Sequence, residues 1–400
     1  MSSFVFAWYS LCRQPARAVL AIAGVAVIGA LLFDMLLLSQ GMLISFRGLL
    51  GEVGFDARVM ATSSMPMTGA RVGDAAATAA AIEALEEIEV VIPMRIDQAE
   101  VVLSERRPMD FTLVGSISGH GAWTVIDGAD INQRKADGDA STIVVNRNLA
   151  SALNLSPGQT VTVRSECLGR RSILPTVEFE VVGIATFPFD SESQLTAAAT
   201  IADFDRACGG EQDQADLFLV ASRSRVTAEA AVEAIQQLRP DLYVFSNDQL
   251  VDRFERVGFS YFRQISTVLA TVTLTFAFLL ISVLLSVSVN QRFAEIAALR
   301  AIGFGRRRVA ADLVWESGLM VSIGGVLALP LGLALAIWLD RILKSMPGIP
   351  ADLHFFVVQP QAVLLHIALL ATAGALAAGY PVYLASRLPI ASTLRNEVVG

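Results

Sequence analysis

The chain has 400 residues, of which 54% are hydrophobic and only 17% are charged, and its formal net charge is -8. A soluble protein of this length would need more polar surface, so the composition indicates a membrane protein. No tract of Lys and Arg resembles a nucleic-acid-binding surface, and we therefore expect the lipid bilayer, not nucleic acid, as a partner.

Four segments have the length and apolarity of a membrane-spanning helix, which needs about 20 mostly apolar residues. Their apolar cores are 18–39, 265–289, 319–339 and 363–384. The first core is longer than that of a secretory signal, and no clean cleavage site follows it, so we predict that it is retained as a span. The sequence therefore predicts an α-helical membrane protein with four transmembrane helices.

A region of roughly 220 residues separates the first two spans, which is enough for one or two compact units. Its patterns are mixed, with a helix predicted at 74–87 that Asp74 caps and another at 227–240 that Pro240 ends. The segment 141–165 predicts strand, short helix, Pro-Gly turn and strand. Further strands are predicted at 90–104, 109–117, 176–186, 215–222 and at the start of 241–257, where a helix follows. We expect a large α+β extracytoplasmic domain inserted between helices 1 and 2.

Arginines decide the predicted orientation, because cytoplasmic ends and short loops carry the excess of Lys and Arg. They favour cytoplasmic N and C termini and a cytoplasmic loop after the second span, with the large domain outside. The predicted segments are an interfacial helix (1–17), TM1 (18–40), the extracytoplasmic domain (41–262), TM2 (263–290), the cytoplasmic loop (291–318), TM3 (319–341), a short outer loop (342–361), TM4 (362–385) and a cytoplasmic tail (386–400).

No catalytic or cofactor pattern was found in the sequence. None of His120, His354 and His366 belongs to an HExxH motif, and there is no G-x-S-x-G motif. A phosphate-binding Walker A loop is also missing, because neither Lys135 nor Lys344 follows a glycine. We therefore expect no enzyme activity, metal or cofactor in this chain, and any ATP that drives it must be bound by another chain.

The three cysteines are Cys12, Cys167 and Cys208, at spacings that fit no zinc site. Cys167 and Cys208 fall in the same predicted domain. They form a disulfide if that domain faces an oxidising compartment, or remain two unpaired thiols.

The cytoplasmic loop between spans two and three has a helical pattern. Apolar residues recur at every third position, and a glycine then ends the pattern; they are Phe293, Ile296, Leu299, Ile302 and Gly303. The pattern alone leaves two interpretations open, a loop whose arginines only fix topology and an ordered helix at the membrane surface.

The sequence "RFAEIAALRAIGFGRRRVAADLVWESGLM" resembles the signature of MacB/FtsX-type ABC transporter permeases. The matching residues are Glu295, Ile296, Leu299, Arg300, Ala301, Ile302, Gly303 and Glu316. The tail "YPVYLASRLPIASTLRNE" is also similar to the ending of that family, and the order of spans and outer domain matches too. The resemblance implies the lipoprotein-releasing and DevC-like branches as nearest relatives, because this sequence lacks the fused ATPase of the macrolide exporters and its outer domain is too large for a typical division-type FtsX.

The resemblance implies a permease subunit that pairs with a second permease chain, identical or not, above separate ATPase subunits. The loop after the second span would then contact the ATPase as a coupling helix, through Phe293, Glu295, Ile296, Leu299, Arg300, Ile302, Gly303, Arg306 and Arg307. It implies export or extraction of a lipid, lipoprotein, peptide or drug-like substrate across a bacterial inner membrane, with a periplasmic membrane-fusion adaptor as a further candidate partner. The alternative is an FtsX-like regulator that transports nothing and activates a cell-wall hydrolase.

Polar and small residues within the spans suggest two further hypotheses. Asp34 and His366 lie at similar predicted depths, near the outer side, and are candidates for an intramembrane polar pair. Rows of small residues permit close helix packing, within the chain or across a dimer, and we favour packing within the chain. The rows are Gly324, Ala328 and Gly332; Ala371, Ala375 and Gly379; and Ser282, Ser286 and Asn290.

Overall fold

The computed structural model divides into two compact units, which are described separately. Unit 1 comprises 1–42, 259–341 and 355–400, and unit 2, called the inserted domain below, comprises 43–258 and 342–354. The structure describes residues 3–13, 15–63, 69–103, 107–117, 119, 122–133, 141–165, 176–208, 213–256, 260–291 and 305–387.

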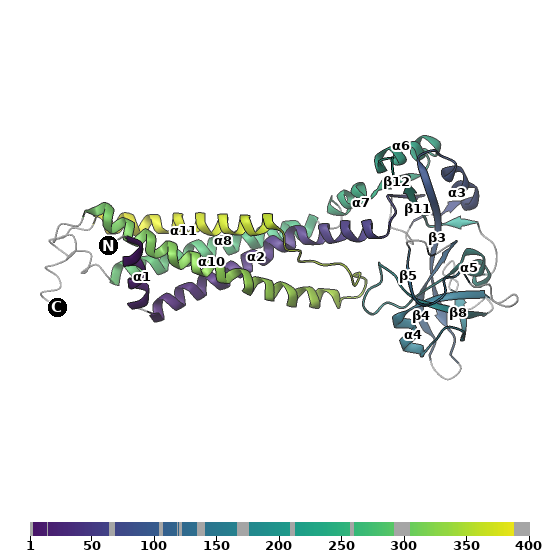
Figure 1. Ribbon diagram of the computed structural model, residues 1–400, viewed down its shortest axis with the longest axis horizontal. Coiled ribbons are helices and arrows are strands. Elements are labelled where there is room, and N and C mark those ends of the chain that lie inside the picture. The colour runs from purple at the N-terminus through teal and green to yellow at the C-terminus, as the bar shows by residue number, and fades with distance from the viewer. Residues whose placement is uncertain are drawn as a thin grey trace. The chain divides into compact units, whose positions relative to one another are not determined.

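Four long helices form the membrane bundle, as the hydropathy predicts (Figure 1). They are α2 (Pro15–Glu52), α8 (Ser260–Gln291), α10 (Arg306–Lys344) and α11 (Pro360–Arg387). Helices suit hydrocarbon because they satisfy every backbone polar group within the segment. Each is longer than its predicted apolar core, because the helices continue into less apolar sequence at their ends.

Glycines set the spacing between α10 and α2. A Cβ added at Gly324 would lie 2.7 Å from Val25 Cβ, and one added at Gly332 would lie 3.0 Å from Phe33 Cδ1. Such contact leaves no room for a larger side chain at either position. The small-residue row of α10 therefore packs within the chain, which confirms the favoured interpretation for that row.

A short helix, α1 (Ser3–Arg13), precedes the bundle. It buries Ala7 and Leu11 and exposes Phe4, Trp8 and Tyr9. This division of apolar and aromatic side chains is the one expected for a helix at a membrane interface. The ring of Phe4 packs edge-on against Trp315 of α10, with centroids 5.7 Å apart.

One part of the inserted domain has a β-α-β-β-α-β arrangement, in which two helices cover one face of an antiparallel sheet. The strand order is β12-β1-β11-β3. Its elements are β1 (Ala57–Met60), α3 (Ala75–Glu83), β3 (Ile88–Val101), β11 (Leu217–Ser222), α6 (Ala228–Leu238) and β12 (Tyr243–Ser246). The core between sheet and helices includes Val59, Ile82, Phe218, Val220 and Ile235.

The second part of the inserted domain is a closed barrel, inserted between β3 and β11. Its strands follow the order β3-β4-β9-β6-β8-β7, and β7 pairs with β3 to close the ring. The added elements are β4 (Met109–Ser116), β6 (Ser141–Asn146), α4 (Arg147–Leu153), β7 (Thr160–Ser165), β8 (Val177–Thr186), β9 (Thr196–Thr200) and α5 (Ile201–Ala207). The interior includes Phe111, Leu113, Ile143, Phe179 and Phe204.

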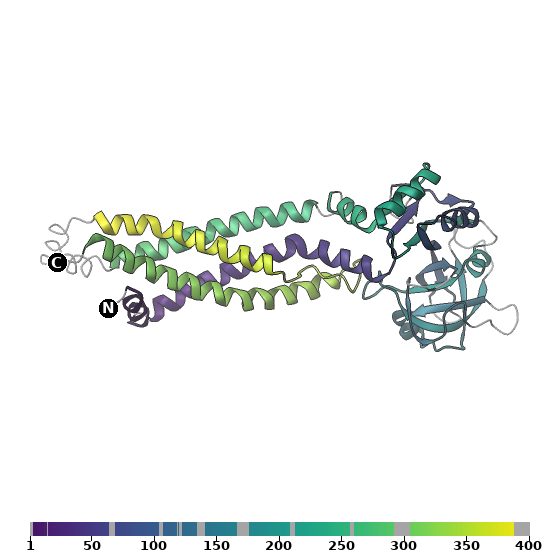
Figure 2. The same cartoon turned by 45° about the horizontal axis from the view of Figure 1, so that its top comes forward.

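The remaining elements are short. They are β2 (Val72–Gly73), which pairs with β10 (Gln214–Ala215); β5 (Thr124–Gly128), which pairs with β8 outside the ring; and α7 (Asn247–Phe254). Ser246 and Gln249 form a capping box at the start of α7. Figure 2 shows the barrel and the helix-covered sheet together in a second view.

The prediction that the Asp74 side chain caps the helix at 74–87 was wrong. Asp74 occupies the position before α3, but it has a left-handed backbone (φ 50°) and its side chain caps nothing. Asp213 caps the helix instead, since its backbone carbonyl accepts from the Ala75 N–H and its side chain accepts from the Ala76 N–H. The helix also ends at Glu83, four residues earlier than predicted.

Removal of the Phe179 ring should destabilise the barrel. This side chain of β8 is fully buried in the barrel interior, and β8 pairs with both β6 and β7. We expect Phe179→Ala to lower the free energy of opening of the β6 and β8 amides by about 3–5 kcal/mol. Hydrogen exchange on the full chain measures this quantity. The exposed Ile126→Ala of β5 is the control, and an equal loss in both variants would contradict the assignment of the core.

Candidate functional site

Most of the predicted coupling residues, at 293, 295, 296, 299, 300, 302 and 303, lie outside the described part of the chain. The structure describes both flanks of that segment. α8 ends at Gln291 before it, and α10 begins at Arg306 after it. The Arg307 side chain is exposed, whereas only the backbone of Arg306 is described.

The first turns of α10 present a mixed basic and aromatic surface. The Arg308 N–H donates to the Gly305 carbonyl at 3.0 Å, and Arg308 Nε lies 3.8 Å from Asp312 Oδ1. Trp315 is 49% exposed beside Phe4 of α1, while Glu316 is buried. α1 and the start of α10 are thus in contact, and α10 begins shortly after the predicted coupling segment in the sequence.

Asp34 and His366 are both fully buried in the bundle. Neither carboxylate oxygen of Asp34 and neither ring nitrogen of His366 has a hydrogen-bond partner among the described residues. The predicted pair is therefore not formed as a hydrogen bond. His366 instead contacts the Phe33 ring, at 5.3 Å between centroids.

A cluster of charged residues that was not predicted from the sequence lies where the helix-covered sheet meets the barrel. Arg71 Nε lies 3.0 Å from Asp216 Oδ1, and Arg71 Nη2 lies 3.0 Å from Asp97 Oδ2. Asp216 also accepts from the Ile96 N–H at 2.8 Å. Burial alone would lower the pKa of Arg71, but the hydrogen bonds and charges of Asp216 and Asp97 raise that pKa above its ordinary value.

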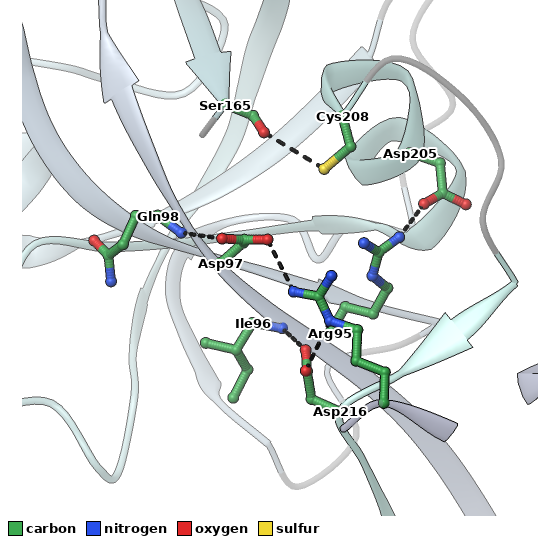
Figure 3. Close-up of polar contacts among 9 residues, drawn as sticks. Arg95, Ile96, Asp97, Gln98, Ser165, Asp205, Cys208 and Asp216 are labelled. Atoms are coloured by element: carbon green, nitrogen blue, oxygen red, sulfur yellow. Dashed lines mark hydrogen bonds and ion pairs between the residues drawn. The ribbon is translucent and has the colours of Figure 1, made fainter. Parts of the chain in front are cut away.

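A second ion pair, formed by Arg95 and Asp205, lies close enough for the charges of Asp97 and Asp216 to act on Arg95 (Figure 3). Arg95 of β3 is fully buried, pairs with Asp205 of α5, and has its guanidinium carbon 4.6 Å from the centre of the Phe204 ring. Burial lowers the pKa of Arg95, and the charge of Asp205 partly opposes that effect. The cluster therefore ties α5, on the barrel, to the strand shared with the neighbouring sheet.

The geometry of this cluster of charged residues indicates a structural role. The carboxylates of Asp97, Asp205 and Asp216 are each held by an arginine or a backbone N–H. No group of three or more potential metal-ligating side chains was found in the described residues. The sequence signal was weak, namely two charged residues at 95 and 97 within an otherwise apolar strand.

The disulfide prediction is partly resolved. Cys208, at the end of α5, is disulfide-bonded, and Cys12 is a free, exposed thiol. Cys167, the remaining cysteine of the sequence, lies outside the described residues. The Cys208 sulfur also lies 3.4 Å from Ser165 Oγ of β7 (Figure 3).

The connection between α10 and α11 binds the barrel part of the inserted domain. The Ala351 N–H donates to the Asp190 carbonyl at 2.8 Å, and Ser191 and Pro350 form an antiparallel bridge. The Asp190 side chain is half-buried and accepts from Asn146 at 2.6 Å and from Thr196 at 2.7 Å. Burial raises the pKa of Asp190, although these two hydrogen bonds oppose the rise.

Two family models match the chain. Residues 18–238 match the MacB-like periplasmic core domain, and residues 267–390 match the FtsX-like permease C-terminal domain. An uncharacterized ABC transporter permease protein of Mycobacterium tuberculosis is 35% identical over 136 residues, which are 33% of this chain and 15% of that relative. The chain thus spans a small part of the length of this relative.

Solved structures give a weaker likeness. The periplasmic region of MacB from Actinobacillus actinomycetemcomitans has a TM-score of 0.40 at 14% identity, and the match covers 52% of this chain and 95% of that one. The extracellular domain of the transporter YknZ from Gram-positive bacteria has a TM-score of 0.34 at 14% identity, with 48% and 98% covered.

Removal of Asp205 should destabilise the inserted domain strongly, because it takes the carboxylate from a fully buried arginine. We expect Asp205→Ala to cost about 3–5 kcal/mol of opening free energy at α5 and β3, and Arg95→Met added to it to restore most of the loss. Hydrogen exchange on the full chain is the readout. Asp241→Ala, in the exposed Arg239 pair, should change little. If Arg95→Met restores nothing, the loss does not come from the buried charge.

The raised pKa of Asp190 predicts a pH dependence. Between the ordinary Asp pKa and the raised one, the unfolded chain gives up a proton that the folded chain retains, so folding stability falls as the pH rises. We expect Asp190→Asn, which cannot ionise, to become progressively more stable relative to the parent chain across this window. Hydrogen exchange at 187–196, corrected for intrinsic rates, tests this. A difference that does not vary with pH would contradict it.

Proposed function

We propose that this chain, which belongs to the MacB/FtsX-type family of ABC transporter permeases, couples ATP hydrolysis by a separate nucleotide-binding subunit to movement of its inserted domain. This movement drives export or extraction of a lipid, lipoprotein, peptide or drug-like substrate. The chain is a multi-pass membrane protein. In the proposed orientation both termini are cytoplasmic and the membrane is the bacterial inner membrane.

The continuity of α2 is the observation that carries this proposal. The helix runs for 38 residues without a break, so it is about 57 Å long, whereas the hydrocarbon of a bilayer is about 30 Å thick. Its last ten residues, 43–52, belong to the inserted domain. A continuous helix transmits a displacement at one end to the other, because a sharp kink would break its backbone hydrogen bonds.

The end of α2 is fixed within the inserted domain by several contacts. Arg47 forms an ion pair with Asp248 of α7 at 3.0 Å, and Phe46 packs on Phe254 with ring centroids 4.8 Å apart. Val53 and Phe55, which follow the helix, are buried against Leu217 and Leu219 of β11. A movement of α2 would therefore reach the sheet directly.

The connection between α10 and α11 supplies a second route. α10 is also about 58 Å long, and the loop that follows it is bound to the barrel at Asp190 and Ser191. The two long helices would thus act on different parts of the inserted domain, α2 on the sheet and α10 on the barrel.

The proposed input is the cytoplasmic loop after α8. Its basic residues and helical pattern suit a surface that rests on an ATPase, and the exposed Arg307 and Trp315 would extend this surface onto α10. ATP would be bound by that partner and not by this chain. A second permease chain would complete the transporter, and a periplasmic adaptor is a further candidate partner.

Disruption of the cytoplasmic loop after α8 should uncouple ATP hydrolysis by the partner subunit from substrate transport. In the reconstituted permease–ATPase complex, we expect Leu299→Asp with Arg300→Glu to abolish substrate stimulation of ATP hydrolysis, because the apolar stripe and the basic residue would no longer contact the ATPase. The measurement is ATPase activity with and without substrate, alongside transport.

Ile126→Asp with Arg147→Glu, at exposed sites of the inserted domain, makes the same chemical changes away from the loop and should leave stimulation unchanged. Retained stimulation in the loop variant would contradict the coupling role. ATP hydrolysis that activates a cell-wall hydrolase while no substrate moves would favour the regulatory function instead.

A further inference from the structure

Part of the connection between α10 and α11 is held against the helices instead of extending into solvent. Residues 353–357, called the strap below, form neither helix nor strand, yet Leu353 and Phe355 are buried. Connections usually run over the surface, because buried backbone N–H and C=O groups need partners. The partners of the strap therefore indicate what holds it in place.

Two consecutive amides of the strap are bound by two different helices. Within unit 1, the Phe355 N–H donates to Asp340 Oδ1 of α10 at 2.8 Å. Within unit 2, the His354 N–H donates to Ser45 Oγ of α2 at 2.7 Å. The bond to the carboxylate is of the stronger, charge-assisted kind. Neighbouring residues of the strap thus connect the last turns of α10 with the last turns of α2.

Gly41 allows the strap to lie directly on the backbone of α2. A Cβ added at Gly41 would lie 2.7 Å from the Val357 backbone nitrogen and closer still to the Phe355 carbonyl oxygen. Because both are backbone atoms, the strap itself would have to move to admit a methyl group. Gly48 of the same helix has open space within 4 Å of its added Cβ among the described residues. The close approach is therefore particular to Gly41.

The Phe356 side chain adds an apolar contact to these backbone contacts. It packs against a buried cluster in unit 1 that contains Phe33 and Leu37 of α2 and Ala336 of α10. Both helices contribute to this cluster. The hydrogen bonds, the contact at Gly41 and the apolar packing thus all bind the strap to the same two helices.

We propose that the strap, with Gly41, Ser45 and Asp340 as positioning residues, fixes the ends of α2 and α10 to each other so that the two helices move together. This inference rests on the proposed coupling function, in which α2 acts on the sheet and α10 on the barrel. Separate displacements of the two helices would strain β3, the strand that the sheet and the barrel share. Helices that move together deliver one displacement to both parts.

The spacing of α2 and α10 tests the proposal in the full chain in nanodiscs. Nitroxide labels on Gln40→Cys and Ile337→Cys, at two exposed positions, report this spacing by pulsed electron paramagnetic resonance in a Cys12→Ser background. We expect one narrow distance, the same in the chain alone and in the complex with its ATPase and ATP. A parent distance that changes when ATP is added would overturn the proposal.

Gly41→Ala separates the strap from the stability of the helix. Alanine favours a helix more than glycine does, so a loss in this variant does not come from weakening of α2. We expect the label distance to become broad and the Phe355 amide to exchange about tenfold faster, as for the loss of a hydrogen bond to a charged group. The matched control Gly48→Ala should change neither. An unchanged distance in the Gly41→Ala chain would overturn the proposal.

A second pair of variants decides the question if Gly41→Ala does not fold. Asp340→Asn keeps an Oδ1 acceptor and should retain the narrow distance, whereas Asp340→Ala removes the acceptor and should broaden it. In the reconstituted complex, Asp340→Ala should also lower the substrate moved per ATP hydrolysed several-fold, and Asp340→Asn should restore it. Equal distances in the two variants would contradict the positioning role of Asp340.

Failure of the proposed function would give a different result. A parent complex that hydrolyses ATP and moves no substrate would contradict coupling to transport. The label distances in the chain without its ATPase do not depend on transport, so they would still decide whether the strap fixes the two helices to each other.

Discussion

The fold depends on one constraint, that a chain in hydrocarbon must satisfy its backbone hydrogen bonds within each segment. This makes the four spans helices, and two of them, α2 and α10, continue well past the thickness of the bilayer. Glycines at 324 and 332 bring these two helices into close contact at Val25 and Phe33. Because they are both long and tightly packed, they are suited to carry a displacement instead of absorbing it.

The inserted domain is organised around β3 in a similar way. Its 14 residues contribute first to the helix-covered sheet and then to the barrel, so neither part is complete without this strand. The ion pairs of Arg71 and Arg95 lie at the transition between the two parts. They join α5 and the strands around it to β3, and a force applied to the sheet would therefore be shared with the barrel.

Helices and strands with a clear hydrophobic periodicity were predictable from the sequence. The four spans, the strand–helix–turn–strand unit at 141–165 and the helix at 228–238 agree with the structure, because their apolar residues face one side of a strand or helix. The strand β9 was missed, since "TAAAT" is fully apolar in its centre, lacks alternation and is rich in alanine, which rarely favours strands. Its place in the barrel depends on neighbours distant in the sequence.

For the candidate sites too, features with a local sequence pattern were predictable, and features formed by residues distant in the sequence were not. The coupling segment was inferred from local pattern, but the charged cluster was not, because Arg71, Arg95, Asp205 and Asp216 come together only after folding. Asp34 and His366 were predicted to pair because they lie at similar depths in their spans, but they form no hydrogen bond. A similar depth does not determine which helix faces are in contact.

The central claim is that α2 transmits movement as a rigid helix, and one measurement tests it most directly. A flexible Gly-Gly-Ser-Gly insertion after Gly48 would interrupt α2 inside the inserted domain, where the space around that glycine is open. Transport by the reconstituted complex should be lost while basal ATP hydrolysis persists. The same insertion after the exposed Arg107, which precedes β4, should preserve transport. Normal transport with the interrupted helix would contradict the account.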